Sequence, residues 1–171
     1  MRTIADIGKT RIGNAGQRLR DDPSSEMNLA ERASPEDLGF RVFKLAESNF
    51  KEWQEVDMGD GASYVRQLDL YADPLLPGWN PNDVIWEVAL KEGFSLSSQI
   101  ERLDTCADSV FYRVLDPDRG QAIVVCLDDS VSTDAVRALE LSKDDRFVCR
   151  DVALDDSLAA NLALGFRLLT L

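Results

Sequence analysis

Adjacent pairs of aspartates are the residues of this sequence whose type and spacing come closest to supporting chemistry. The pairs are Asp21-Asp22, Asp128-Asp129, Asp144-Asp145 and Asp155-Asp156. Carboxylate pairs can hold Mg²⁺, the usual metal of phosphoryl transfer. Asp128-Asp129 directly follows the apolar run 121–127, and open α/β sheets bind ligands beyond the ends of such strands. The alternative, which we favour, is a polar loop that leads into a helix N-terminus, where acidic side chains complement the helix dipole.

The other common catalytic groups are missing from the sequence. There is no histidine in 171 residues, which excludes Ser-His-Asp and Cys-His catalysis and most catalytic zinc sites. Cys106, Cys126 and Cys149 are odd in number and far apart, so they indicate neither a disulfide framework nor a zinc knuckle. Neither GxGxxG nor GxxxxGK[ST] occurs. The sequence therefore predicts no catalytic, cofactor-binding or metal-binding residue, and no cofactor.

Charge is distributed unevenly along the chain. The formal net charge is −12, but residues 1–20 carry five basic side chains against one acidic one, and the other 151 residues carry 14 against 30. An acidic body of this kind repels phosphate and does not suit broad nucleic-acid binding. Lys9, Arg11, Arg18 and Arg20 are the candidate contacts to DNA or to a protein partner. The alternative is a solvated helix face turned toward this protein's own acidic body.

The elements that must position these residues are typical of an α/β fold. A stripe of apolar residues over 3–19 predicts a helix, which three glycines weaken, so that it needs something to pack on, such as another chain. Further helices are expected over 64–71, from Asn80 to Gly93, from Ser132 or Asp134 onward, and over 158–164. Strands are expected over 40–45, 110–115, 121–127, 146–149 and 166–171.

Strands that alternate with helices in the second half predict a mixed or largely parallel sheet with flanking helices. We expect residues 1–37 to form an N-terminal helical arm and linker, and residues 38–171 to form the α/β domain. No apolar run reaches the length of a membrane span and no signal peptide opens the chain, so we predict a cytoplasmic protein without membrane contact.

An ordered set of segments carries a family resemblance. The segments are Ile4–Ile7 with Arg11-Ile12 and Ala15-Gly16, Phe40–Leu45 followed by Ser48–Trp53, Leu68–Tyr71 with Asp73-Pro74, Trp86–Phe94, Ala122–Leu127 and Arg146–Cys149. Together they resemble the C-terminal region of the adenine-specific DNA methyltransferases of type III restriction–modification systems, the Mod subunit. No single segment is specific for that family, whereas their order and spacing are.

The resemblance does not extend to the family's catalytic core. That core has an FxGxG loop for S-adenosylmethionine and a DPPY-type tetrapeptide that holds the flipped adenine. The nearest strings here, Asp73-Pro74-Leu75-Leu76 and Asn80-Pro81-Asn82-Asp83, lack the second proline and the aromatic ring. The resemblance therefore implies a methyltransferase tail without its catalytic core: a truncated fragment, an excised piece or a separate polypeptide.

Three hypotheses for function follow. The first is a non-catalytic module that serves subunit assembly, either by dimerising Mod or by docking the restriction subunit; its partners would be protein subunits of a restriction–modification complex or a second copy. The second is a DNA-contacting accessory module that uses the basic N-terminal helix. The third and weakest is a Mg²⁺-dependent phosphoryl-transfer enzyme that uses Asp128 and Asp129.

Overall fold

The computed structural model describes residues 3–21, 38–53, 55, 60–103 and 109–171. Contacts divide the chain into two compact units, Met1–Ala46 and Glu47–Leu171. The linker expected before residue 38 lies outside the described residues, apart from Asp21, and so does Cys106. The predicted domain boundary between residues 37 and 38 therefore stays a prediction.

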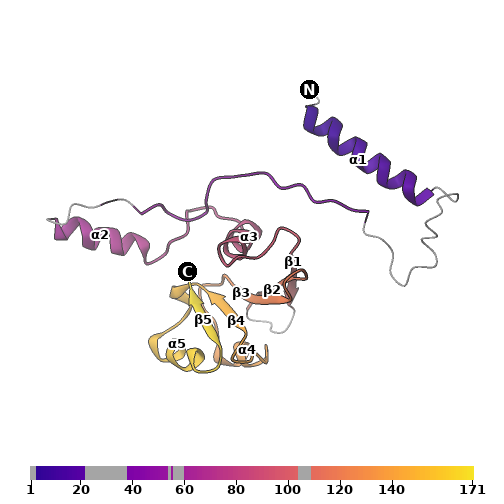
Figure 1. Cartoon of the computed structure of the whole chain (residues 1–171). Helices are drawn as coiled ribbons and strands as arrows, with labels where there is room; N and C mark the ends of the chain where they lie inside the picture. The colour runs from indigo at the N-terminus through magenta and orange to yellow at the C-terminus, as the bar shows by residue number, and fades with distance from the viewer. Residues whose placement is uncertain (1–2, 22–37, 54, 56–59, 104–108) are drawn as a thin grey trace. The chain divides into compact units, whose positions relative to one another are not determined.

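The described residues form helices and strands in this order (Figure 1): α1 (Ile4–Asp21), α2 (Gly61–Tyr71), α3 (Pro81–Lys91), β1 (Gln99–Leu103), β2 (Phe111–Asp116), β3 (Gln121–Cys126), α4 (Thr133–Arg137), β4 (Arg146–Cys149), a 3₁₀ turn η1 (Asp151–Ala153), α5 (Asp156–Ala163) and β5 (Arg167–Thr170). None of these helices, over the ranges that the structure describes, is long and apolar enough to cross a membrane.

The sheet confirms the expected α/β class with mixed strand directions. Its strand order is β1-β2-β3-β4-β5. The pairs β1·β2 and β2·β3 are antiparallel, and the pairs β3·β4 and β4·β5 are parallel. Parallel neighbours need a crossover connection between them, and α4 and α5 lie in those two connections. The flanking helices that the sequence predicts are thus the links that make half of the sheet parallel.

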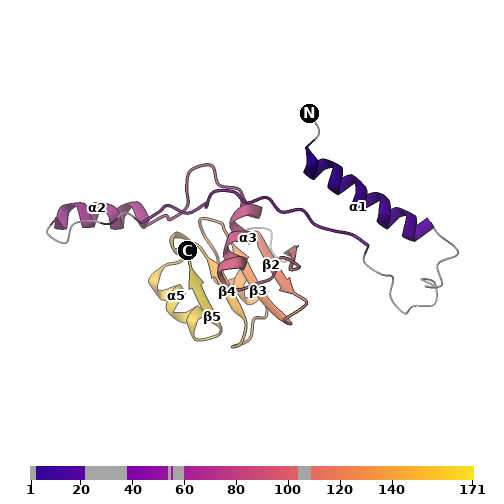
Figure 2. The ribbon, with the colours of Figure 1, turned by 45° about the horizontal axis from the view of Figure 1, so that its top comes forward.

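Strand β3 lies at the centre of the core and is buried on both faces. Val125 packs in the cluster beneath α3, together with Val88 of that helix. Val124 packs on the opposite face with Phe147, beside α4 and α5. Figures 1 and 2 show α3 on one side of the sheet and α4 and α5 on the other. The continuous apolar run over 121–127 reflects this burial on both faces.

Local capping explains where helices α3 and α4 begin. Asn80 Oδ1 accepts a hydrogen bond from the Asn82 N–H at 2.9 Å, and Pro81 follows as the first helical residue. Such a cap satisfies one of the N–H groups that the first helical turn leaves free. At α4, Ser132 Oγ accepts from the Ala135 N–H at 3.2 Å. Of the two alternatives that the sequence left open, Ser132 is therefore the cap.

Two strand assignments from the sequence need correction. The predicted strand over 40–45 is wrong, because residues 38–48 adopt neither helix nor strand. A strand needs a neighbouring strand to satisfy its backbone groups, and none of the strands in the described ranges pairs with this segment. Its side chains stay exposed, Leu45 to 99%. Conversely, β1 was missed because it is an exposed edge strand whose sequence QIERL lacks regular apolar alternation.

Glu140, just after α4, adopts a backbone conformation that suits glycine better. Its φ is 50°, in the left-handed region, which costs a residue with a Cβ about 1 kcal/mol. We expect Glu140→Gly to raise the free energy of unfolding by about 0.5–1 kcal/mol in urea titrations. Glu140→Ala is the matched control, since it removes the same exposed side chain but keeps the strain. Equal stability of the two variants would contradict this explanation.

Candidate interaction site

Helix α1 begins with a reciprocal cap that fixes its first turn. The Thr3 N–H donates to Asp6 Oδ2 at 2.9 Å, and the Asp6 N–H donates to Thr3 Oγ1 at 3.2 Å. This pattern is a capping box. The backbone hydrogen bond from Thr3 lowers the pKa of Asp6 below its usual range, so the carboxylate stays charged at the positive end of the helix.

The four basic residues singled out in the sequence all lie on α1, and all are exposed. Successive helical residues are turned by about 100°. By that geometry Arg11 and Arg18 lie on the same side as the stripe that begins with Ile4, whereas Lys9 and Arg20 lie on the opposite side. No residue of α1 is buried, and its isoleucines are 50–90% exposed. Within the described residues of its own unit, α1 therefore presents an exposed apolar face that also carries two arginines.

In the second unit, the segment Ser48–Trp53 contacts α3, the core cluster below α3, and α2. Its first two residues contact α3. The Ser48 hydroxyl and the Asn49 N–H and side-chain amide all donate to the carboxylate of Glu87, with Asn49 N at 2.8 Å and Nδ2 at 3.2 Å. Lys91 Nζ lies 3.0 Å from the same carboxylate. Burial alone would raise the pKa of Glu87, but these hydrogen bonds lower it to about 2. Glu87 is thus a charged anchor for the chain that precedes α2.

The next residues of this segment hold α2. Phe50 forms a β-bridge with Leu75 and packs against the core cluster below α3. Lys51 Nζ donates to the carbonyl oxygen of Leu70 at 2.7 Å and to that of Asp73, at the end of α2. Carbonyl groups in the last turn of a helix have no partner within the helix, and a lysine there also opposes the helix dipole. Lys51 therefore acts as a structural cap.

Trp53 completes the contact with α2. Its ring lies 5.1 Å from the ring of Tyr71 and 6.3 Å from that of Tyr64, measured between centroids, with the Tyr64 pair edge to face. Such aromatic pairs each contribute about 0.5–1.5 kcal/mol beyond their buried area. The segment Ser48–Trp53 thus consists largely of residues that hold α2 and α3 together.

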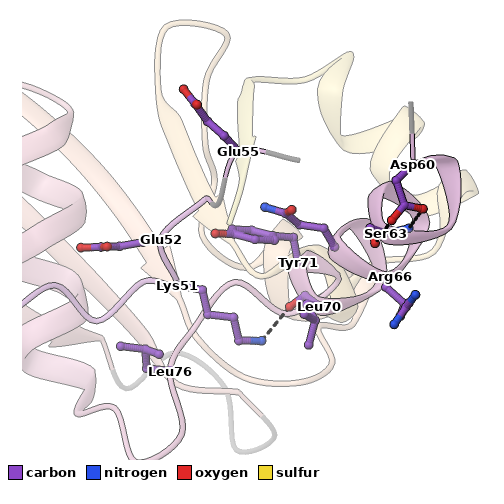
Figure 3. Close-up of a pocket in the computed structure, with 10 residues that line it drawn as sticks. Lys51, Glu52, Glu55, Asp60, Ser63, Arg66, Leu70, Tyr71 and Leu76 are labelled. Atoms are coloured by element: carbon purple, nitrogen blue, oxygen red, sulfur yellow. Dashed lines mark hydrogen bonds between the residues drawn. The ribbon is translucent and has the colours of Figure 1, made fainter. Parts of the chain in front are cut away.

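A groove runs between this segment and α2 (Figure 3). Its volume is about 720 Å³, and Leu70, Tyr71 and Leu76 supply its apolar surface. Leu70 is 62% exposed and Leu76 41% exposed. The groove is thus a partly apolar, open surface of a kind that binds peptides and helices.

The charged groups at the groove are mostly acidic. Glu52, Glu55 and Asp60 line it, together with Arg66 and Lys51. The hydroxyl and N–H of Ser63 donate to Asp60 and lower the pKa of that carboxyl group. Lys51 is already held by two carbonyl oxygens, so the lining has three carboxylates and one further cation, Arg66. A ligand that suits this groove is apolar and basic.

The acidic pair Asp128-Asp129 lies at the carboxyl end of β3, as expected, but its two side chains have different partners. Asp128 Oδ2 accepts from the Val110 N–H at 2.7 Å, whereas Asp129 pairs with Arg150 at the end of β4. Arg150 also lies 3.0 Å from Asp73 Oδ2. Within the described ranges, no group of three or more Cys, Asp or Glu side chains is arranged to hold a metal ion. These contacts make Asp129 part of a structural clamp.

The two cysteines that the structure describes are buried thiols. Cys126 and Cys149 lie opposite one another in β3 and β4. Burial raises the pKa of Cys126 to about 11 and that of Cys149 to about 12. Both are therefore protonated near neutral pH and act as packing residues rather than nucleophiles.

Sequence reasoning missed the groove and its supporting contacts. Glu87 and Arg150 drew no attention, because a charged residue inside an apolar helix or after a strand is usually a solvated one. Comparison of the chain with protein-family models, with curated proteins and with solved structures finds no match.

Proposed function

We propose that this chain is a non-catalytic module, related to the C-terminal region of type III Mod methyltransferases, that serves subunit assembly in the cytoplasm. Its task is to join subunits of a restriction–modification complex, by dimerising Mod or by docking the restriction subunit. The observation that carries the proposal is the apolar face of α1, which the described residues of its own unit leave exposed. Helices with a Gly-interrupted sequence gain most of their stability by packing.

The experiment has two parts. The purified chain is incubated with DNA and labelled S-adenosylmethionine. It is then mixed with purified Mod and restriction subunits of a type III system while light scattering measures the mass of any complex. We expect no methyl transfer and a complex of defined stoichiometry. Methyl transfer by the chain alone would contradict the proposal. So would a chain that binds neither those subunits nor a second copy of itself.

A DNA-contacting role is the second candidate, because all four basic side chains of α1 are exposed. Phosphate contacts release counterions, so an affinity due to Lys9, Arg11, Arg18 and Arg20 falls steeply as salt rises. Binding to a DNA duplex measured from about 50 to about 200 mM salt decides this. A flat salt dependence, or no binding at low salt, removes the candidate.

A further inference from the structure

We propose that Cys126 and Cys149 are a redox-sensitive pair, in which a disulfide closes between β3 and β4 when the chain meets a small-molecule disulfide such as oxidised glutathione. The product is a covalent link across the parallel half of the sheet. The inference does not depend on the proposed assembly role. It rests on the register of two strands and on the place of both thiols in one core cluster.

The two cysteines lie directly opposite one another. Cys126 is the last residue of β3 and Cys149 the last residue of β4, and the two are register partners in this parallel pair. Neighbouring strands lie about 4.8 Å apart, which falls within the Cα separation of about 4.4–6.8 Å that a disulfide spans. The pair therefore has the backbone spacing that the bond requires.

Both side chains also point to the same face of the sheet. They belong to the cluster that packs beside α4 and α5. Val125 and Val148, one residue earlier in each strand, belong to the cluster on the other face. Because register partners on one face of a sheet have adjacent side chains, the structure sets two reduced thiols side by side.

Thiol–disulfide exchange supplies the chemical step. The thiolate of one cysteine attacks oxidised glutathione, whose S–S bond breaks and releases one glutathione thiolate. The thiolate of the second cysteine then attacks the mixed disulfide, forms the Cys126–Cys149 bond and releases the second glutathione thiolate. Two electrons pass from the pair to the oxidant, and the protons of the two cysteine thiols go to the two released thiolates.

Burial decides when this step takes place. Both cysteines are fully buried, so they remain packing residues while the sheet is closed and react when β3 and β4 separate by local opening. Once the sheet closes again, the bond is equally shielded from reductants. It joins the strand ends that the ion pair between Asp129 and Arg150 already connects, so oxidation reinforces that junction.

The test is the thiol–disulfide equilibrium of a Cys106→Ser chain in glutathione buffers, because Cys126 and Cys149 are then its only cysteines. Peptide mapping under non-reducing conditions measures the fraction that carries the internal bond, in native buffer and in denaturing urea. We expect the equilibrium constant for closing the bond to be at least about tenfold larger in the folded chain, since the sheet holds the thiols together. The melting temperature of the oxidised chain should then exceed that of the reduced chain by about 5 °C or more.

Val148→Cys/Cys149→Val in the same chain is the matched control. It keeps the composition of β4 and moves the thiol by one residue, to the other face of the sheet. The internal bond should still close in urea, but folding should no longer favour it. Urea unfolding of the reduced control shows whether it folds, and the comparison of folded with unfolded Cys106→Ser chain decides the inference without it.

Three outcomes would overturn the inference. The first is an equilibrium constant in the folded Cys106→Ser chain that is no larger than in urea, including the case in which only single glutathione adducts form. The second is an oxidised chain that melts below the reduced one. The third is a folded control variant that favours the bond as strongly as the chain with Cys149 in place.

Discussion

Glu87→Ala is expected to lower the free energy of unfolding by about 3 kcal/mol at pH 7. Glu87 accepts hydrogen bonds from the hydroxyl of Ser48 and from two N–H groups of Asn49, and it pairs with Lys91. Hydrogen bonds to charged groups contribute about 1.5–3 kcal/mol each, and bonds that share one carboxylate do not add fully. Urea unfolding measures the loss. Glu87→Gln keeps an acceptor but removes the charge, so it should lie between wild type and Glu87→Ala.

The same anchor predicts a pH dependence. The pKa of Glu87 is about 2 in the folded protein, against an ordinary value of 4.5. A carboxyl group whose pKa is lowered by folding contributes stability above its unfolded pKa and loses it as the pH falls toward the folded value. The difference in stability between wild type and Glu87→Ala should therefore be largest above about pH 5 and should shrink between pH 4.5 and 2. A difference that is constant over this range would show that Glu87 acts through packing alone.

Asp73→Asn/Asp129→Asn is expected to cost about 3 kcal/mol, because it leaves the guanidinium of Arg150 buried without a counter-charge. The Arg150 side chain is only 9% exposed, whereas those of Asp73 and Asp129 are 43% and 85% exposed. The guanidinium also lies 5.8 Å from the Trp79 ring. The buried member of the cluster is thus Arg150. Water cannot solvate its guanidinium when Asp73 and Asp129 no longer carry a charge.

Arg150→Met provides the control for this clamp. It removes the buried charge and keeps an unbranched apolar side chain, while both carboxylates remain accessible to water. Replacing a buried ion pair by an apolar residue is often close to neutral, so we expect a loss of about 1 kcal/mol or less. Adding Arg150→Met to the double asparagine variant should recover most of the lost stability. A larger loss for Arg150→Met than for the asparagine pair would contradict this account.

The α/β class and most of the elements could be predicted because their signals are local. Asn80-Pro81 marks the start of α3, Asp116 to Gly120 marks the turn between β2 and β3, and the apolar run from Gln121 marks a strand buried on both faces. The mixed strand direction follows from the same pattern, because two strands joined by a short turn must be antiparallel while strands joined through helices become parallel. These inferences need no information about distant contacts.

The rest could not be predicted because it depends on which segments meet. Phe40–Leu45 alternates as a strand does, yet alternation only shows that a segment suits pairing and does not supply a neighbour. Glu87 contacts Ser48 and Asn49, which lie 39 and 38 positions before it in the sequence. Arg150 contacts Asp73 and Asp129, which lie in other loops. The groove beside α2 arises from such distant contacts, so its charges could be read from the sequence whereas their grouping could not.

The measurement that tests the central claim most directly is the mass in solution of the chain mixed with the restriction–modification subunits that we propose as its partners, compared with that of an α1 variant. Ile7→Asp/Ile12→Asp places two charges on the apolar stripe, and Thr10→Asp/Gln17→Asp places two on the opposite side of the same helix. If α1 docks on another polypeptide, the first variant loses at least tenfold in affinity and the second behaves like the wild type, since an unpaired charge in an apolar contact is costly. If both variants assemble as the wild type does, the apolar face of α1 is not an assembly surface.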